Sequence, residues 1–350
     1  MTANSDGITR RRFITTAATG IAAAGLLGRV EAAGATLAAP SSRVVAVSST
    51  EVFSGSDIDG AVVSRMLDSG AQALTPEGGL WESLFSADDV VGIKLNCIAR
   101  TVKPNKALID AVVECLKRAG VKENNIIVWD RFEDQLARRA RLTLNAGSEG
   151  VRVYGSERGG DSVSGYDKDV YYESDQDTAE YRGETGTRSL VTKIVTTDCT
   201  KIINMPVLKD HNQAGVTACL KNLAFGSVNN TARFHKAPMY CSPAVPEIFA
   251  LKPIAEKTVL HILDGLKVCY NGGPDASNPA FITNHSTIYL SRDPVACDTV
   301  ALGVVEQMRA DAGLPDLFTT SGQPVHVAKA AEMGLGQGDR GKIDLVKLAV

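Results

Sequence analysis

Cationic and amide side chains gather in one stretch of the sequence, residues 204–236, which reads NMPVLKDHNQAGVTACLKNLAFGSVNNTARFHK. It holds three lysines, one arginine, two of the five histidines and five asparagines, and Asp210 is its only acidic residue. The whole chain has a formal net charge of −3, so the positive excess is local. Ammonium and amide groups suit a phosphate or a carboxylate. The stretch predicts a site for a small anionic ligand, and the plainer alternative is a solvated basic face.

Three residues of this stretch are candidates for catalysis. His211 could transfer protons, because imidazole titrates near neutral pH. Lys209 and Lys221 lie among other cations, which can depress the pKa of a lysine, so each could act as a base or form a Schiff base. Seven further residues are expected to contact the ligand: Lys94, Asn96, Lys106, Asn204, Asn222, Arg233 and His235.

A mononuclear metal site is the alternative use of the same histidines. Imidazole with carboxylate suits divalent zinc, iron or manganese, and Asp264 and Asp298 are the candidate carboxylate ligands. The spacing matches no metal motif, and Asp298 could instead pair within a helix. The cofactor therefore stays open, with a divalent metal as the candidate.

These candidates follow the ends of apolar strands. Strands are expected at residues 89–96, 125–130, 200–208, 258–266 and 286–294. Their ends deliver Lys94 and Asn96, then Asp130, Asn204, Asp264, and finally Arg292 with Asp293. In open α/β sheets, ligands bind outside the carboxyl ends of the strands. We expect the five ends to converge on one rim.

Helical patterns alternate with the strands. Residues 60–74 and 105–120 carry apolar side chains at helical spacing, and the second of these segments separates two strands. A strand–helix–strand unit of this kind predicts an α/β fold with a mostly parallel sheet and helices on both faces. Asp293 is expected to cap a later helix, with Pro294 in its first turn. A polar stretch, 155–187, is expected to form a surface excursion or small β subdomain within one domain, residues 42–350.

Several of these segments together resemble the DUF362 family. They are, in order, VGIKLN, NMPVLKDH, GVTACLKNLAFG, LHILDGL and LSRDPVACDTVAL, and the resemblance extends from about Val44 to about Leu345. Many members carry an added ferredoxin-like segment with CxxC repeats, which this sequence lacks. The resemblance implies an α/β architecture and a set of site residues: Lys94, Asn96, Asn204, Pro206, Lys209, His211, Lys221, Asn222, Asp264, Asp293 and Asp298.

The seven cysteines argue against an iron–sulfur cluster. No two form a CxxC pair, and none stands at zinc spacing from a histidine. Their number is odd, so at least one thiol is unpaired within the chain, and the sequence does not assign disulfides. The acidic net charge also argues against a nucleic-acid partner.

The N-terminal residues resemble a twin-arginine export signal. Arg10 and Arg11 follow Thr9, Arg12 stands at the variable position of the pattern, and Phe13 and Ile14 come next, before an Ala/Gly-rich run. That run is too short and too weakly apolar for a stable membrane span of about 20 residues. We therefore expect a signal peptide over residues 1–38, export of the folded chain by the twin-arginine machinery, and a periplasmic or other extracytoplasmic location.

Taken together, these features favour an exported α/β enzyme that acts on a small anionic substrate bearing a phosphate or carboxylate. The alternative is a non-catalytic ligand- or metal-binding accessory protein of a periplasmic redox system.

Overall fold

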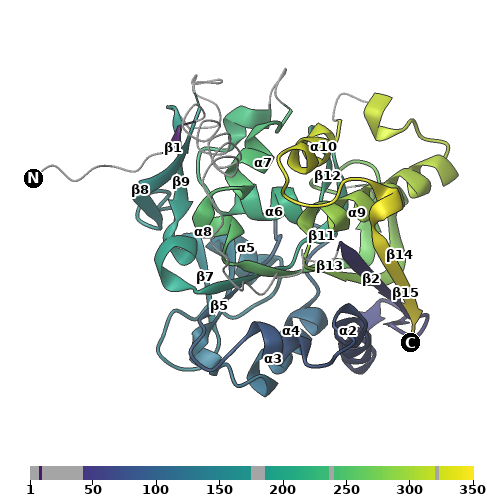
Figure 1. Ribbon diagram of the computed structural model, residues 1–350, viewed down its shortest axis with the longest axis horizontal. Coiled ribbons are helices and arrows are strands. Elements are labelled where there is room, and N and C mark those ends of the chain that lie inside the picture. The colour runs from purple at the N-terminus through teal and green to yellow at the C-terminus, as the bar shows by residue number, and fades with distance from the viewer. Residues whose placement is uncertain (1–7, 10–41, 175–185, 236–239, 277, 320–322) are drawn as a thin grey trace, which may run out of the picture.

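A single large sheet forms the centre of the protein (Figure 1). The computed structural model describes residues 8–9, 42–174, 186–235, 240–276, 278–319 and 323–350. The strands follow the order β15-β2-β14-β13-β10-β5-β6-β7, and β11 with β12 pairs beside β13. The bounds are β2 Arg43–Ser48, β5 Val91–Lys94, β6 Ile126–Phe132, β7 Arg152–Glu157, β10 Lys201–Asn204, β11 Val207–His211, β12 Gly215–Thr217, β13 Thr258–Cys269, β14 Ile282–Ser291 and β15 Asp344–Ala349.

Most neighbouring strands of this sheet run parallel. The run from β13 through β10, β5 and β6 to β7 is parallel throughout, and β15 is parallel to β2. β14 is antiparallel to both of its neighbours, and β12 is antiparallel to β11. The predicted α/β fold with a mostly parallel sheet is confirmed.

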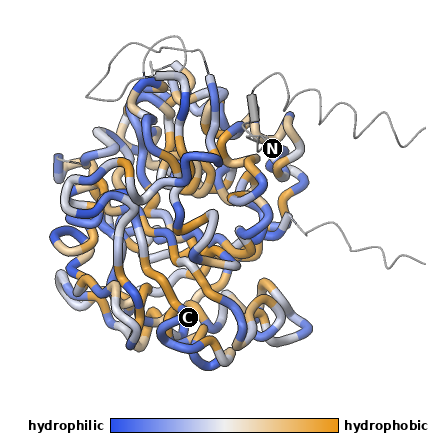
Figure 2. Tube along the Cα trace, turned by 90° about the vertical axis from the view of Figure 1, so that its left-hand side faces the viewer, coloured by the Kyte–Doolittle hydropathy of each residue, from blue (hydrophilic) through white to orange (hydrophobic). Residues whose placement is uncertain are grey.

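Helices cover both faces of the sheet. In Figure 1, α2, α3 and α4 lie on one side, and α6, α7, α9 and α10 lie on the other. Each side has its own apolar core, and the apolar segments run through the interior in Figure 2. The helices are α2 Gly60–Leu74, α3 Leu80–Leu84, α4 Lys106–Arg118, α5 Glu133–Arg138, α6 Cys219–Gly226, α7 Ala244–Phe249, α8 Lys252–Ala255, α9 Pro294–Asp311 and α10 Val325–Glu332.

Local chemistry explains where the helices begin. The side chains of Asp59, Asn105 and Asp293 accept hydrogen bonds from the first backbone N–H groups of α2, α4 and α9, which would otherwise lack a partner. After α4, Gly120 adopts a positive φ of 92°, which glycine tolerates at a helix end. α6 differs, because its cap Ala218 has no side-chain acceptor.

Two details of the predicted strands were wrong. The strand expected at 200–208 is interrupted at Pro206, which has no N–H to donate, so β10 and β11 are separate strands. The second error is the expectation that all five strand ends meet at one rim, because β14 runs antiparallel to its neighbours. Ser291, at its carboxyl end, pairs with His261 near the start of β13. Arg292 and Asp293 therefore lie at the opposite edge from the carboxyl ends of β13, β10, β5 and β6.

Part of the polar stretch contributes one strand, β8, to a second, smaller sheet. β8 (Tyr166–Glu173) and β9 (Arg188–Thr192) pair antiparallel, and β1 (Ile8–Thr9) pairs parallel with β8. Residues 175–185 of that stretch lie outside the described residues. So do Arg10, Arg11 and nearly all of the predicted signal peptide. Within the part of the chain that the structure describes, every helix is too short or too polar to cross a membrane.

Candidate functional site

A cavity of about 600 Å³ opens beside the carboxyl ends of β5 and β6. The helix α6 and the loop between β11 and β12 contribute the facing side. Six of the residues predicted from the sequence line it: Lys94, Asn96, His211, Lys221, Asn222 and His235. The structure thus brings together residues that lie more than a hundred positions apart in the chain.

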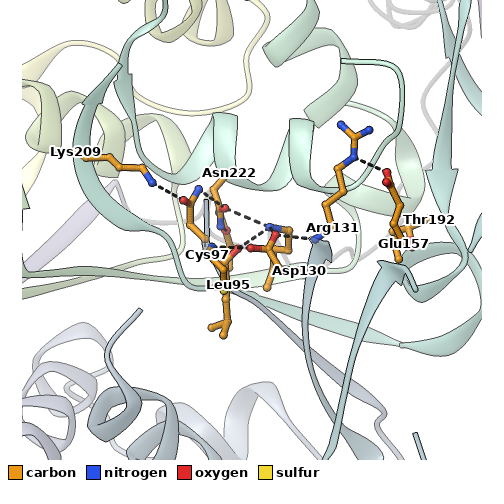
Figure 3. Close-up of polar contacts among 12 residues, drawn as sticks. Leu95, Cys97, Asp130, Arg131, Glu157, Thr192, Lys209 and Asn222 are labelled. Atoms are coloured by element: carbon orange, nitrogen blue, oxygen red, sulfur yellow. Dashed lines mark hydrogen bonds and ion pairs between the residues drawn. The ribbon is translucent and has the colours of Figure 1, made fainter. Parts of the chain in front are cut away.

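Lys94 is held at the inner end of the cavity by fixed acceptors. As the last residue of β5 it is buried, and its Nζ donates to Asp130 Oδ1 at 2.7 Å and to Asn222 Oδ1 at 3.3 Å. Asp130 also accepts hydrogen bonds from the backbone N–H groups of Cys97 and Arg131 (Figure 3). Both oxygens of this carboxylate therefore accept hydrogen bonds, and the carboxylate balances the charge of Lys94 inside the protein.

Three asparagine amides extend this network away from Lys94. Asn96 Nδ2 donates to Asn222 Oδ1 at 3.0 Å, and Asn222 Nδ2 donates to Asn204 Oδ1 at 2.8 Å. Asn204 Nδ2 in turn donates to the carbonyl of Cys219 at 2.7 Å and contacts His261 Nδ1 at 3.1 Å. Asn204 is fully buried and does not line the cavity, so its role is to orient Asn222.

Lys209 lies behind the cavity wall. Its side chain is 0% exposed, and its Nζ donates to Asn96 Oδ1 at 2.6 Å (Figure 3). Burial, followed by the nearby charge of Lys221, lowers the pKa of Lys209 to about 7. Near neutral pH this ammonium is therefore close to losing its proton, but the side chain does not line the cavity.

Lys221 differs from the other lysines at the site. It comes from α6, lines the cavity and is 8% exposed. Its Nζ lies 3.4 Å from His235 Nε2 and 4.9 Å from the centroid of the Phe225 ring. No carboxylate among the described residues lies within ion-pair distance of this ammonium. Burial lowers the pKa of Lys221, because its surroundings disfavour the charge.

Backbone contacts fix the tautomers of the two cavity histidines. The N–H groups of Gln213 and Ala214 both donate to His211 Nδ1, at 3.0 and 3.1 Å, so neutral His211 carries its proton on Nε2. His235 Nδ1 lies 3.1 Å from the carbonyl of Thr231 and must donate to it, which leaves Nε2 as an acceptor facing Lys221. The ring centroids are 5.5 Å apart. Burial, then the charge of Lys221, holds the pKa of His211 well below its usual range.

The cavity lining also contains an ion pair that was not predicted from the sequence. Arg131 Nε donates to Glu157 Oε1 at 2.7 Å, and Arg131 Nη1 donates to Thr231 Oγ1 at 3.0 Å. Tyr166 Oη also donates to Glu157 Oε1, at 2.8 Å. Arg131 directly follows the strand end at Asp130, which could have drawn attention to it. Glu157 ends β7 inside the polar stretch and gave no such signal.

Besides Asn204, two other residues predicted to contact the ligand do not line the cavity. Lys106 is on the exposed surface of α4, where it pairs with Asp110 one helical turn later. Arg233 is buried and donates to backbone carbonyls of residues 174, 187 and 230 and to Ser189 Oγ. These contacts make Arg233 a link between the 3-10 turn Ala232–His235 and the small sheet.

The carboxylates predicted as metal ligands have backbone partners. Asp264 accepts from the N–H groups of Asn105 and Leu266, and burial raises its pKa to about 6. Asp298, from α9, accepts from the N–H groups of Cys219 and Leu220, so it supplies the cap that α6 lacks in its own sequence. Neither lines the cavity, and in the described ranges no three His, Cys, Asp or Glu side chains are arranged to hold a metal ion.

The cysteines and Asp293 also have structural surroundings. All seven cysteines are buried free thiols. Asp293 accepts from the N–H groups of Val295 and Ala296 as the predicted cap of α9, and from that of Gln337.

Comparisons with known proteins give a family match and distant structural likenesses. The model of the family described as "Domain of unknown function (DUF362)" matches residues 91–303. No curated protein matches the sequence. A crystal structure of a protein from Thermotoga maritima is 11% identical, with a TM-score of 0.44 over 75% of this chain and 61% of that chain. The lactate racemase apoprotein from Thermoanaerobacterium thermosaccharolyticum is 11% identical, with a TM-score of 0.42 over 75% of this chain and 57% of that chain.

This chain therefore spans less than two thirds of either solved structure. The family match is of a different kind, since it covers more than half of this chain and contains all six predicted residues that line the cavity. The protein belongs to the DUF362 family.

Proposed function

We propose that this protein is an enzyme that binds a small anionic substrate in the cavity beside β5, β6 and α6. The proposal rests on one observation: the cations that line this cavity differ in whether a carboxylate is paired with them. Lys94 and Arg131 are each paired with a carboxylate, Asp130 and Glu157. Lys221 lines the same cavity, and no carboxylate of the described residues is within ion-pair distance of it. An anionic substrate group would supply the missing counter-charge.

The two histidines could move protons in such a complex. His211 has an Nε2–H to donate, and His235 has an Nε2 lone pair to accept a proton. A donor and an acceptor side by side in one cavity are the requirement for general acid–base catalysis. The fixed amides of Asn96 and Asn222 would orient the substrate, because their partners hold them in one rotamer.

The size and lining of the cavity fit a small molecule. A volume of about 600 Å³ lies within the usual range of ligand pockets. Apolar side chains, Ile98, Phe132 and Phe225, line it beside the polar groups. We infer a substrate with one anionic end and a short carbon skeleton, acted on after export of the folded protein by the twin-arginine route.

A non-catalytic ligand- or metal-binding accessory protein is the competing function. The two candidate metal ligands, Asp264 and Asp298, already accept two backbone hydrogen bonds each. This favours an anionic ligand over a bound metal ion. An enzyme would convert the bound anion into a product, whereas a binding protein would release it unchanged.

A thermal-shift series with small anions tests the proposal. Phosphate, glycolate, succinate and pyruvate are each compared with chloride at equal ionic strength, because a ligand that binds only the folded state raises the melting temperature. We expect at least one organic anion to raise it in a saturable way, and product analysis by NMR then follows conversion. If none of them exceeds chloride, the proposed anion site is wrong.

A further inference from the structure

We propose that Lys221 forms an imine with its substrate, so that the substrate class is a small carbonyl compound with an anionic group, such as a 2-oxo acid. This inference rests on the proposed function and specifies the chemistry of the same cavity.

The position of Lys221 suits a nucleophile. Its Nζ lies at the cavity, against the face of the Phe225 ring at 4.9 Å. The two other lysines of the site are unsuited, for different reasons. Lys94 Nζ is held in a buried ion pair by Asp130 at 2.7 Å. Lys209 Nζ is behind the wall, bonded to Asn96. Lys221 is thus the lysine at this cavity whose amine could lose a proton and still reach a substrate.

His235 is placed to take that proton. The carbonyl of Thr231 fixes the ring proton on Nδ1, so the Nε2 lone pair faces the Lys221 ammonium at 3.4 Å. Burial lowers the pKa of Lys221, which makes this transfer easier. The pair has the arrangement of an activated nucleophile, an amine beside a base whose orientation a third group fixes.

Donors for the carbonyl oxygen and the anionic group are also present. His211 has its proton on Nε2 and lines the cavity. Thr217, the last residue of β12, lines the cavity, and its buried hydroxyl has no hydrogen-bond partner among the described residues. A buried hydroxyl without a partner is costly, so a ligand oxygen that accepts from it would remove that cost.

The reaction balances without any added reagent. The Lys221 ammonium gives one proton to His235, and the neutral amine attacks the carbonyl carbon, forming an N–C bond while the C=O π electrons move to oxygen. The adduct then carries two protons on nitrogen and none on oxygen; His211 gives its Nε2 proton to the oxygen and regains one from the nitrogen, giving a neutral carbinolamine. Loss of the hydroxyl group with a second proton, from the His235 imidazolium, releases water. The iminium that remains carries one positive charge, as the ammonium did, so the anionic group of the substrate keeps its counter-charge.

Reductive trapping tests the inference on the whole protein. The folded protein is incubated with pyruvate or glyoxylate and sodium cyanoborohydride, then analysed by intact-mass and peptide mass spectrometry. We expect one adduct for each chain, on the peptide that contains Lys221. Lactate and glycolate are the matched anions without a reactive carbonyl and should give none.

Two variants separate this inference from the proposed function. Lys221→Arg keeps a cation but cannot form an imine, and Lys221→Met removes both properties. Each is checked for folding by circular dichroism. We expect at least a tenfold loss of adduct in both, with lactate and pyruvate binding retained only by Lys221→Arg. If wild-type protein binds lactate and pyruvate alike but gives no adduct, or if the adduct spreads over surface lysines such as Lys106, the imine is wrong and the anion site stands. If wild-type protein binds neither anion, the 2-oxo acid class is wrong, and the anion site is wrong as well when none of the anions of the thermal-shift series binds.

Discussion

The ammonium group of Lys94 occupies the space that Gly226 leaves by having no side chain. A Cβ at position 226 would overlap Cε and Nζ of Lys94. Gly226 is the last residue of α6, and it also lines the cavity. The close approach lets β5 and α6 share one ion pair and one amide network, and it explains why a helix that carries Lys221 and Asn222 ends in glycine here.

Gly226→Ala should therefore displace Lys94 from Asp130. A broken buried ion pair costs about 3–5 kcal/mol, and the better helix propensity of alanine returns at most about 1 kcal/mol. We expect a net loss of about 3 kcal/mol in the free energy of unfolding, measured by urea denaturation. Gly60→Ala is the control, because its Cβ would meet only Ala107 Cβ at an ordinary 3.8 Å. Equal stability of the two variants would show that Lys94 moves aside freely.

The alternation of apolar strands and amphipathic helices was sufficient to predict the fold. α2 has the predicted bounds, and β5, β6 and α4 lie within a few residues of theirs, because burial on both faces of a parallel sheet leaves a strong apolar pattern. The direction of β14 could not be predicted in this way. Strand periodicity is the same in both directions, and the direction depends on the connection after β13.

The sequence predicted the site residues that lie at the carboxyl ends of parallel strands. Lys94, Asn96 and Asp130 come together because β5 and β6 are adjacent and parallel. Asp298 shows what the sequence hides. It stands five residues into α9 after its cap, yet it caps a different helix, α6, and only tertiary packing determines such a contact. Arg233 likewise resembles a ligand-binding cation in sequence, although its donors are used by backbone carbonyls.

Burial of Lys209 should make the stability of the protein rise with pH. Its pKa is about 7 in the folded chain and about 10.4 in an unfolded chain. Between these values the unfolded state binds more protons, so the free energy of unfolding increases by up to about 1.4 kcal/mol per pH unit. Lys209→Met lacks this contribution. We expect the difference between wild type and variant to change by about 2 kcal/mol in favour of wild type from pH 7 to pH 9. A difference that does not change with pH, like that expected for the exposed control Lys106→Met, would contradict the assignment.

Asp298 should act as a helix cap and not as a metal ligand. Asp298→Ala leaves the buried N–H groups of Cys219 and Leu220 without an acceptor, which costs about 2–4 kcal/mol. The loss should be the same with EDTA as with added zinc, measured by urea denaturation. Asp110→Ala, which removes an exposed ion pair with Lys106, should change stability by less than about 1 kcal/mol. A loss that disappears in EDTA would favour a metal at Asp298.

Export should depend on the arginine pair near the N-terminus. Changing Arg10 and Arg11 together to lysine should leave the protein in the cytoplasm, because the twin-arginine machinery recognises that pair. Arg12→Lys is the matched control, since the third arginine stands at a variable position of the pattern. Cell fractionation and immunoblotting give the result. Normal accumulation of the double variant outside the cytoplasm would exclude this route.

The affinity of the cavity for an anion, with and without Lys221, tests the central claim most directly. Isothermal titration calorimetry of pyruvate and succinate would compare wild type with Lys221→Met, and with Lys106→Met as a control of equal charge change. We expect Lys221→Met to weaken the binding of whichever anion binds by about 1.5–3 kcal/mol, the scale of a hydrogen bond to a charged group, and Lys106→Met to leave it unchanged. Equal affinity of the wild type and Lys221→Met would contradict the account, because the anion would then bind without the cation on which the proposed function rests.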